Sequence, residues 1–365
     1  MKMTSQAMNF AKSNEDLFKK YQDTMNHWLH KNEGLDTEYN SEFSLDEKES
    51  QLSEALIEAT LKRASADYAV GQPVDVWFND RHIQEHLFAI VGQMVDANIP
   101  DTINRSIGAY TDIRVGGFGD SFNFDVKSND LFLVSRVGHG KRNSEIHREF
   151  KGQTSIIPEA RQLSAGVNLY RVLSGHASLA ELTMKIIKSI ETEITKDTYD
   201  VFYAAMDAID STATTGLLVS GYTQETLVRI CGQVGAWNNG AKPIVMGTQL
   251  AMVNVLPDDA NYRYTLDSDY AKLGYVKTAF GYDTMVIPQI ANRATQFGAN
   301  VISNDRLWIL SPGASKLLKL CLEGKTLSFL DGAMDNANLS QNVSFMKMWK
   351  SAFCSNSVAG VIQLT

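Results

Sequence analysis

Residues 118–137 read Phe118-Gly-Asp-Ser-Phe-Asn-Phe-Asp-Val-Lys-Ser-Asn-Asp-Leu-Phe-Leu-Val-Ser-Arg-Val137. Phe122, Phe124 and Val126 fall on one side of an extended chain, and the polar residues between them fall on the other. This period of two is typical of a β-strand that is covered on one face. We predict a two-faced β-hairpin that turns at residues 128–130, because Ser, Asn and Asp favour turns. We expect its own subunit to cover too little of the apolar face, and a neighbour's surface to cover the rest.

A long amphipathic helix is predicted after this hairpin. Ser178-Leu-Ala-Glu181 is a capping box, in which a Ser N-cap and a Glu three residues later begin a helix. The apolar residues behind it recur every three or four positions: Leu179, Leu182, Ile186, Ile190 and Ile194. The pattern continues to about Ile209, so the helix would be roughly 45 Å long at ~1.5 Å per residue.

Two further helices are predicted before the hairpin. Ser44-Leu-Asp-Glu47 is a second capping box and begins a helix that reaches about Ala64. Asp80 begins another helix, which we expect to run through Val95 and to end before Pro100.

From Thr223 on, the sequence pattern is typical of a compact α/β region. Thr223 begins a helix that ends at Asn238-Asn-Gly240, and a short helix is predicted from Thr248 to Val255. Buried strands are predicted at 243–246, 284–287 and 306–310, and residues 258–283 are predicted as an acidic loop. Ser311-Pro312 predicts the start of a helix that reaches Gly324, since Pro suits the first helical position. The tail, 343–364, is predicted as strands.

Composition excludes several classes of protein. The chain has 365 residues, of which 44% are hydrophobic and 21% charged, so it can bury a sizeable core. A net charge of -8 argues against tight nucleic-acid binding through a basic surface. The three cysteines form no C-x-x-C pair, which argues against a zinc site or a disulfide framework. No apolar run is long enough to span a membrane.

One short motif suggests an enzyme. His82-Ile-Gln-Glu85-His86 has the H-x-x-E-H form of an inverted zinc-peptidase motif, in which two His bind zinc and Glu is the general base. A soluble metallohydrolase that uses His82, Glu85 and His86 is therefore one alternative. The other interpretation is a surface helix face, because Ile83, Leu87 and Ile90 mark the opposite, buried side.

We otherwise expect no catalytic, cofactor-binding or metal-binding residues, and no cofactor. Gly116-Gly-Phe-Gly119 lacks the Lys-Ser/Thr and the helix of a phosphate-binding loop, so it predicts a bend at the base of the hairpin.

Charge is distributed unevenly between the hairpin and the long helix. Residues 181–210 contain seven Asp or Glu and three Lys. The basic groups near the hairpin tip are His139, Lys141, Arg142, Arg148 and Lys151. A basic hairpin on one subunit and an acidic helix on the next would be complementary.

Two longer segments resemble a known family. The segment Ile156-Ile-Pro-Glu-Ala-Arg-Gln-Leu-Ser-Ala-Gly-Val-Asn-Leu-Tyr-Arg-Val-Leu-Ser-Gly-His-Ala-Ser-Leu-Ala-Glu181 resembles the entry to the spine helix of tailed-bacteriophage major capsid proteins. Two later stretches are similar to the segment of these proteins in which the axial domain ends and the chain returns to the peripheral domain. They are Lys272-Leu-Gly-Tyr-Val-Lys-Thr-Ala-Phe-Gly-Tyr-Asp-Thr-Met-Val-Ile-Pro288 and, after it, Asp305-Arg-Leu-Trp-Ile-Leu310. The order of predicted elements over roughly residues 68–365 is also similar.

The resemblance implies an α+β fold of the Hong Kong phage type. Residues 1–108 would be the N-terminal arm with helices, and 109–158 the extended β-hairpin loop. Residues 159–221 and 306–365 would form the peripheral domain with the spine helix, and 222–305 the axial domain.

The resemblance also implies a non-enzymatic function. Such proteins self-assemble into hexamers and pentamers that form an icosahedral shell around double-stranded DNA. Their partners would be further copies of the chain, neighbouring capsomers through the N-terminal arm and extended loop, loosely contacted DNA, and portal, scaffold and cement proteins, with no membrane. The location would be the virion, after assembly in the host bacterial cytoplasm. An encapsulin-like nanocompartment shell of the same fold is the alternative within this class.

Overall fold

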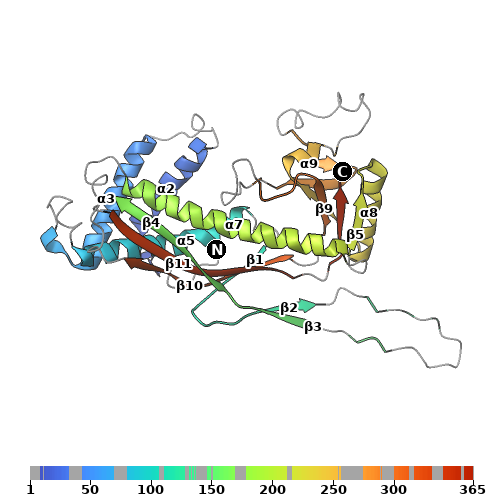
Figure 1. Ribbon diagram of the computed structural model, residues 1–365, viewed down its shortest axis with the longest axis horizontal. Helices are drawn as coiled ribbons and strands as arrows, with labels where there is room; N and C mark the ends of the chain where they lie inside the picture. Colours follow the sequence, from blue (N-terminus) through green and yellow to red (C-terminus); the bar gives the residue numbers. More distant parts are fainter. Residues whose placement is uncertain are drawn as a thin grey trace.

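The computed structural model describes residues 9–10, 12–32, 43–69, 80–106, 111–127, 131–132, 134, 136, 146–148, 151–168, 178–211, 216–253, 255, 274–287, 289, 300–311, 316–330, 340–354 and 357–364. These residues form two main β-sheets, linked by one long helix, and a separate two-stranded ribbon (Figure 1). The predicted α+β class is confirmed.

The first sheet has four strands in the order β1-β10-β11-β4. β1 (Thr111–Gly116) runs parallel to β10 (Leu318–Leu330), whereas β10 pairs antiparallel with β11 (Ser340–Phe353). β4 (Glu159–Asn168) pairs antiparallel with β11 and is an edge strand of this sheet.

α7 (Leu179–Ser211) lies along one face of this sheet and continues to the second sheet (Figure 1). Its 33 residues confirm the predicted long helix, and the Glu181 N–H donates to Ser178 Oγ over 3.3 Å, which is one of the two hydrogen bonds of a capping box. Ile186, Ile190 and Ile194 are all buried in the large core. The predicted apolar stripe is therefore the face that holds the helix on the sheet.

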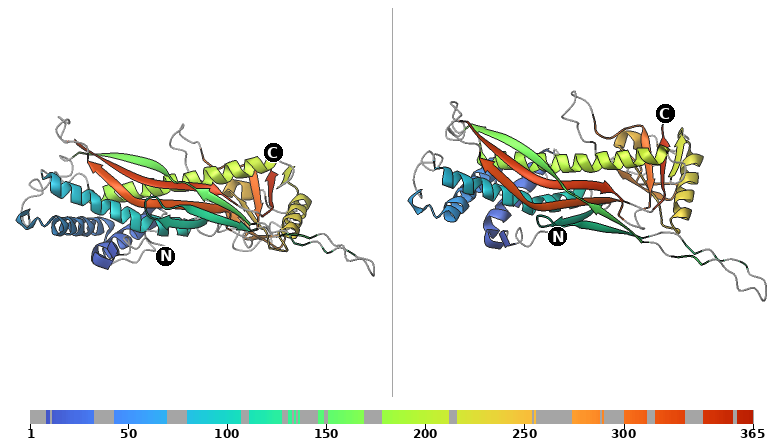
Figure 2. Two further views of the ribbon diagram at one scale, coloured as in Figure 1. Left: turned by 90° about the horizontal axis from the view of Figure 1, so that it is seen from below. Right: turned by 60° about the horizontal axis from the view of Figure 1, so that its bottom comes forward.

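The N-terminal helices add a further layer beside α7. α2 (Glu15–Asn32) packs on α3 (Leu45–Ala64), and α3 packs on both α5 (Arg81–Ser106) and α7. A short 3-10 helix, η1 (Asp67–Ala69), follows α3. Figure 2 shows this helical layer at the end of the molecule away from the second sheet. The capping box at Ser44 and Glu47 is present in full, as predicted.

The expected end of α5 before Pro100 is wrong, because the helix continues through Pro100 to Ser106. An interior Pro removes one backbone hydrogen bond and costs ~3 kcal/mol. Ala97 and Ile99, on the turn before Pro100, are almost completely buried, and this burial offsets part of the cost of the proline.

The second sheet has six strands in the order β5-β12-β9-β6-β8-β7. The ranges are β5 (Gly216–Ser220), β6 (Ile244–Gly247), β7 (Thr278–Ala279), β8 (Tyr282–Val286), β9 (Arg306–Leu310) and β12 (Ala359–Gln363). α8 (Gln224–Trp237) packs on β12 and β9, and α9 (Gln249–Val253) packs on β6. The predicted start at Thr223 is confirmed, but the loop predicted for 258–283 is wrong where β7 and the start of β8 lie.

This sheet combines strands from distant parts of the chain. β6, β7 and β8 come from the predicted axial range, whereas β9 and β12 come from the predicted peripheral range. The domain boundaries stay a prediction.

The helix predicted after Ser311-Pro312 is wrong, because residues 318–330 form β10. Leu318, Leu320 and Leu322 face the large core, whereas Cys321 belongs to a different cluster on the opposite face. A strand that is buried on both faces has no period of two, and its apolar run cannot be told from a buried helix.

Two glycines are expected to have opposite effects on stability. A Cβ on Gly360 in β12 would lie 2.5 Å from Ile230 Cγ2, so Gly360→Ala overpacks the contact with α8 and lowers the free energy of unfolding by ~1–3 kcal/mol. A Cβ on Gly232 in α8 meets no atom within 4 Å, so Gly232→Ala raises that free energy by ~0.5–1 kcal/mol. Urea unfolding of both variants checks this, and a shift of both in the same direction would contradict it.

Candidate functional site

The arm of the molecule is a two-stranded ribbon. β2 (Phe122–Lys127) pairs antiparallel with β3 (Lys151–Ile156), from Phe122 opposite Ile156 to Lys127 opposite Lys151. Figures 1 and 2 show the ribbon leaving the body on the side of the second sheet. The predicted pairing within the hairpin of residues 118–137 is wrong, because β2 pairs with β3 instead. Residues 128–130 themselves lie outside the described residues.

The predicted alternation in β2 is confirmed, but the expectation that its apolar face lacks cover in its own chain is wrong for the base of the arm. Phe122 and Phe124 are buried, whereas Asn123 and Asp125 are exposed. The two rings and Ile156 of β3 pack on Cys321 of β10. The base of the arm is therefore fixed to the body by a small core of its own.

Polar contacts add to this attachment. The Arg114 guanidinium stacks on the Phe124 ring at 4.0 Å and donates to the Asn123 carbonyl. Gly119 has a φ of 80° and donates its N–H to Glu323 Oε1 over 2.7 Å. The predicted bend at Gly116–Gly119 is confirmed as the turn between β1 and β2, and a positive φ favours Gly there.

Beyond the ribbon, the described arm residues are exposed, and four of them are large and apolar. The exposed fractions are 75% for Leu131, 62% for Phe132, 97% for Val134 and 86% for Ile146. Large apolar side chains that are exposed in a single subunit become candidates for contact with another chain when several lie on one segment.

The sequence suggests that a basic arm and an acidic α7 are complementary, and the structure gives only part of this arrangement. Arg148 is exposed, as is Arg136, which sequence reasoning did not single out. The side chains of His139, Lys141, Arg142 and Lys151 lie outside the described residues.

On α7, several acidic side chains already have partners in the same chain. The pairs are Glu181 with Lys185, Glu191 with Lys188, Glu193 with Lys196 and Asp197 with Arg161. The helix is thus less acidic at its surface than its composition suggests.

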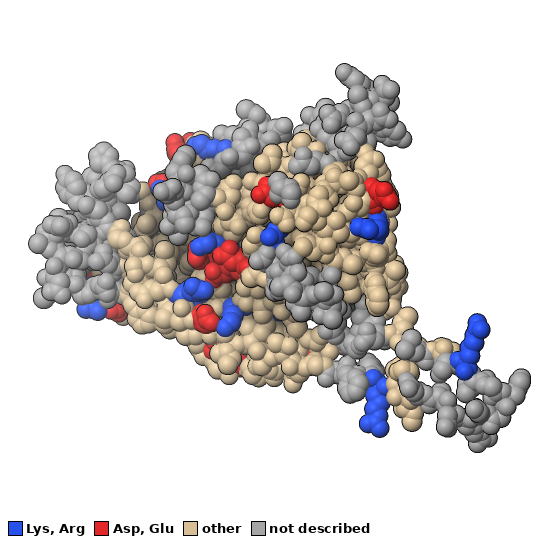
Figure 3. Space-filling model, turned by 45° about the vertical axis from the view of Figure 1, so that its right-hand side comes forward, with Lys and Arg blue, Asp and Glu red and all other residues tan. Residues whose placement is uncertain are grey.

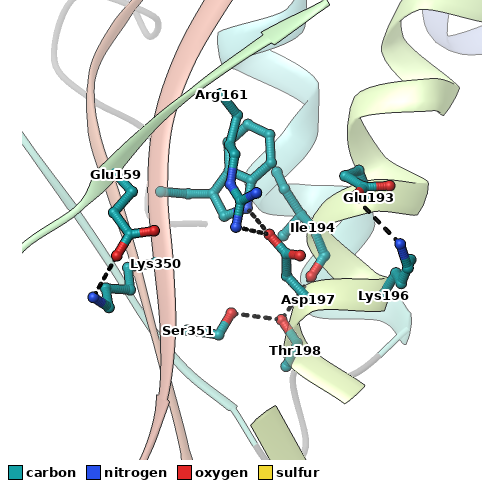
Figure 4. Close-up of polar contacts among 10 residues, drawn as sticks. Glu159, Arg161, Glu193, Ile194, Lys196, Asp197, Thr198, Lys350 and Ser351 are labelled. Carbon is teal, nitrogen blue, oxygen red and sulfur yellow. Dashed lines mark hydrogen bonds and ion pairs between the residues drawn. The ribbon is translucent and has the colours of Figure 1, made fainter. Parts of the chain in front are cut away.

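A groove lies between α7 and the edge of the first sheet. It encloses about 730 Å³, and its lining includes Arg161 and Leu163 of β4, Ile190 of α7 and Trp349 of β11. Figure 4 shows the polar contacts beside it: Asp197 accepts from Trp349 Nε1 over 2.9 Å and lies 3.3 Å from Arg161. Figure 3 shows Lys and Arg beside Asp and Glu on the described part of the body, whereas the charged side chains that it shows on the arm are Lys or Arg.

An ion pair lies buried beneath this groove. Lys347 Nζ lies 2.6 Å from Asp96 Oδ1 and donates to the Gly324 carbonyl over 2.8 Å. Asp96 also accepts from the N–H and the hydroxyl of Thr326. The network joins α5 to β10 and β11, and sequence reasoning missed it because Asp96 is more than 200 residues from Thr326 and Lys347 in the chain.

The structure does not favour the metallohydrolase alternative. His82 and His86 pack edge to face on the surface of α5 with ring centroids 4.5 Å apart, and Glu85 pairs with Arg81 over 3.0 Å. Burial and the neighbouring His82 lower the pKa of His86. Among the described residues, no group of three or more His, Cys, Asp or Glu side chains could hold a metal ion. No described helix is long and apolar enough to cross a membrane.

No protein-family model and no curated protein matches the chain. Solved structures that match it include the mature capsid of bacteriophage PhiM1 (8% identity, TM-score 0.46) and the capsid of cyanophage P-SCSP1u (12%, 0.46). Each match covers 70% of this chain and 86% of the other chain. The head structure of Helicobacter pylori bacteriophage KHP40 matches at 10% identity and a TM-score of 0.44, covering 70% of this chain and 90% of the other. Other matches include the capsid of a native GTA particle, at 11% identity and a TM-score of 0.46, covering 71% of this chain and 90% of the other.

Proposed function

We propose that the chain is the major capsid protein of a tailed phage, which self-assembles into hexamers and pentamers that close as an icosahedral shell around double-stranded DNA. The observation that supports this best is the arm, which is fixed at its base and carries exposed apolar residues away from the body. A contact between two different surfaces on identical subunits makes a ring when its rotation closes. Such a protein needs no catalytic group.

The layout of the body also fits this proposal. The resemblance in sequence implies an N-terminal arm, an extended hairpin, a long helix and two β-containing domains. In the structure, the helices α2, α3 and α5 come before the β2–β3 ribbon and α7 comes after it, while β1 and β4 of the first sheet flank the ribbon in the chain. We propose that the arm contacts neighbouring capsomers and that the shell contacts DNA loosely, since the net charge is -8. The proposed location is the virion, after assembly in a bacterial cytoplasm, with portal, scaffold and cement proteins as further partners.

The test is to express the chain alone and measure particle size by electron microscopy and light scattering. We expect rings or closed shells with five-fold and six-fold symmetry. Particles of this kind that hold protein cargo instead of DNA when made in the native host would contradict the viral part of the proposal. A species that stays small both alone and with the capsid proteins encoded beside it would contradict the assembly function.

A further inference from the structure

The strand β10 contains a bulge beside the base of the arm. Glu323 lies opposite Met348 of β11 and Leu327 lies opposite Met346, so β10 advances four residues where β11 advances two. Gly324, within the bulge, has a φ of 60°, a backbone conformation that favours glycine. A bulge bends its strand and changes the direction of the groups around it, so this one can orient a segment that is attached to it.

The base turn of the arm is attached to this bulge by two contacts. The Gly119 N–H donates to Glu323 Oε1 over 2.7 Å. The Phe118 ring lies directly against Gly324, because a Cβ built on this glycine would lie within 2.6 Å of three ring atoms. Carbon atoms in ordinary contact are ~3.5–4.0 Å apart, so the ring can lie this close only because Gly324 has no side chain.

The base turn is short and internally bonded, so a movement at the bulge is passed on to β2. The Gly117 N–H donates to Asp120 Oδ2 over 2.6 Å. Phe122, the first residue of β2, comes only two residues after Asp120. Figures 1 and 2 show the ribbon projecting from the body, so a small rotation at its base moves its outer end by a larger distance.

The bulge is also held by the buried ion pair. Lys347 Nζ donates to the Gly324 carbonyl over 2.8 Å and lies 2.6 Å from Asp96 Oδ1. Asp96 accepts from the Thr326 N–H over 2.9 Å and from the Thr326 hydroxyl over 2.6 Å. The side chains of Lys347 and Asp96 are 4% and 10% exposed, so water competes little for these bonds. Residues of α5 and β11 therefore fix the same backbone on which the Phe118 ring lies.

We propose that the β10 bulge, residues 323–326, sets the direction in which the arm leaves the body. Glu323 and Gly324 position the base turn of the arm, and Asp96 and Lys347 position the bulge. This rests on the proposed assembly function and names the residues that orient the arm for it. A ring closes only when the rotation between copies is fixed, and a fixed arm direction supplies part of that constraint.

Distances between two spin labels on the full-length chain test the proposal. Asp125→Cys on β2 and Val228→Cys on α8 replace exposed side chains and carry the labels. Cys354 is replaced by Ser because it is only partly buried, whereas Cys231 and Cys321 are buried. The labelled chain is diluted into unlabelled chain, so that only distances within one copy are measured.

Gly324→Ala is expected to shift the mean distance between the labels, because the Phe118 ring must move away by about 1 Å or more to restore ordinary contact. The matched control is Gly281→Ala, since Gly281 has a φ of 84° and a Cβ there meets no atom within 4 Å. The control has the same backbone strain without the clash and should leave the distance unchanged. In a Phe118→Ala background, Gly324→Ala should add no further shift, as a double-mutant cycle requires of an effect that acts through the ring.

Two further variants loosen the bulge without introducing a clash. Glu323→Ala removes the acceptor of the Gly119 N–H. The double variant Asp96→Ala, Lys347→Met removes the bonds that hold the bulge but leaves no unpaired buried charge. Both should broaden the distribution of distances between the labels, including under conditions where the chain is fully folded.

Distance distributions of Gly324→Ala and Glu323→Ala that match the unmodified chain would overturn this inference and leave the capsid function standing. Equal shifts for Gly324→Ala and Gly281→Ala would overturn it as well. If Gly324→Ala does not fold, the result for Glu323→Ala decides. Failure of the unmodified chain to assemble, alone or with its neighbouring capsid proteins, would overturn the proposed function, whereas the distances within one copy would still decide whether the bulge orients the arm.

Discussion

Replacing Phe124 with Ala is expected to lower the free energy of unfolding by ~3–5 kcal/mol and to free the arm from the body. The Phe124 ring is 1% exposed and packs with Phe122, Ile156 and Cys321. Its removal leaves a cavity and takes away the surface on which Arg114 stacks. Guanidinium unfolding measures the loss of stability, and electron microscopy should show open or irregular assemblies in place of closed shells.

The matched control for this variant is Phe132→Ala on the distal arm. Phe132 is 62% exposed in the single subunit, so its loss should change the free energy of unfolding by less than ~0.5 kcal/mol. If Phe124→Ala unfolds like the unmodified chain, the base of the arm is not held by its own core as described.

Replacing Asp96 with Ala is expected to lower the free energy of unfolding by ~3–5 kcal/mol, because it leaves a buried ammonium without its partner. Lys347 is only 4% exposed, and its remaining contact would be the Gly324 carbonyl. The Thr326 N–H would also lose its acceptor. Thermal and urea unfolding of the purified subunit measure the effect.

Two comparisons separate the buried charge from the loss of a contact. The double variant Asp96→Ala, Lys347→Met removes both charges and should recover much of the stability. Glu159→Ala removes the partner of Lys350 from an exposed pair at 2.6 Å and should cost less than ~1 kcal/mol. Equal losses for Asp96→Ala and Glu159→Ala would contradict the interpretation.

Local signals in the sequence predicted the elements that depend on neighbouring residues. The capping boxes at Ser44 and Ser178 place the starts of α3 and α7 correctly, because the hydrogen bonds involved span three residues. The alternation in β2 shows which side chains are buried. It does not show what buries them, since Cys321 is almost 200 residues away.

The wrong predictions have a common physical cause, which is tertiary contact overriding local preference. The Ser-Asn-Asp signal at 128–130 suggested a short hairpin, but Phe122 and Ile156 fix the register of β2 against β3 over a longer connection. Pro100 suggested a helix end, but burial of Ile99 keeps α5 helical.

The groove could not be predicted from the sequence for the same reason. Asp197 brings together Arg161 of β4 and Trp349 of β11, which are 188 residues apart in the chain and become neighbours only through the pairing of these strands. No local motif marks any of the three. The exposed apolar residues of the arm, in contrast, are visible in the sequence as Leu131-Phe-Leu-Val134 directly after a polar turn signal.

The most direct test of the central claim, that the distal arm drives assembly, is to shorten the arm. In this variant an Asn-Gly turn joins Lys127 directly to Lys151, which are opposite each other in the β2–β3 register, so the base of the arm can keep its pairing. Sedimentation velocity of the purified protein then reports both its folding and its assembly. The account predicts a folded, small species with the melting temperature of the unmodified subunit and no shells. Shells that form from the shortened chain as readily as from the full one would contradict it.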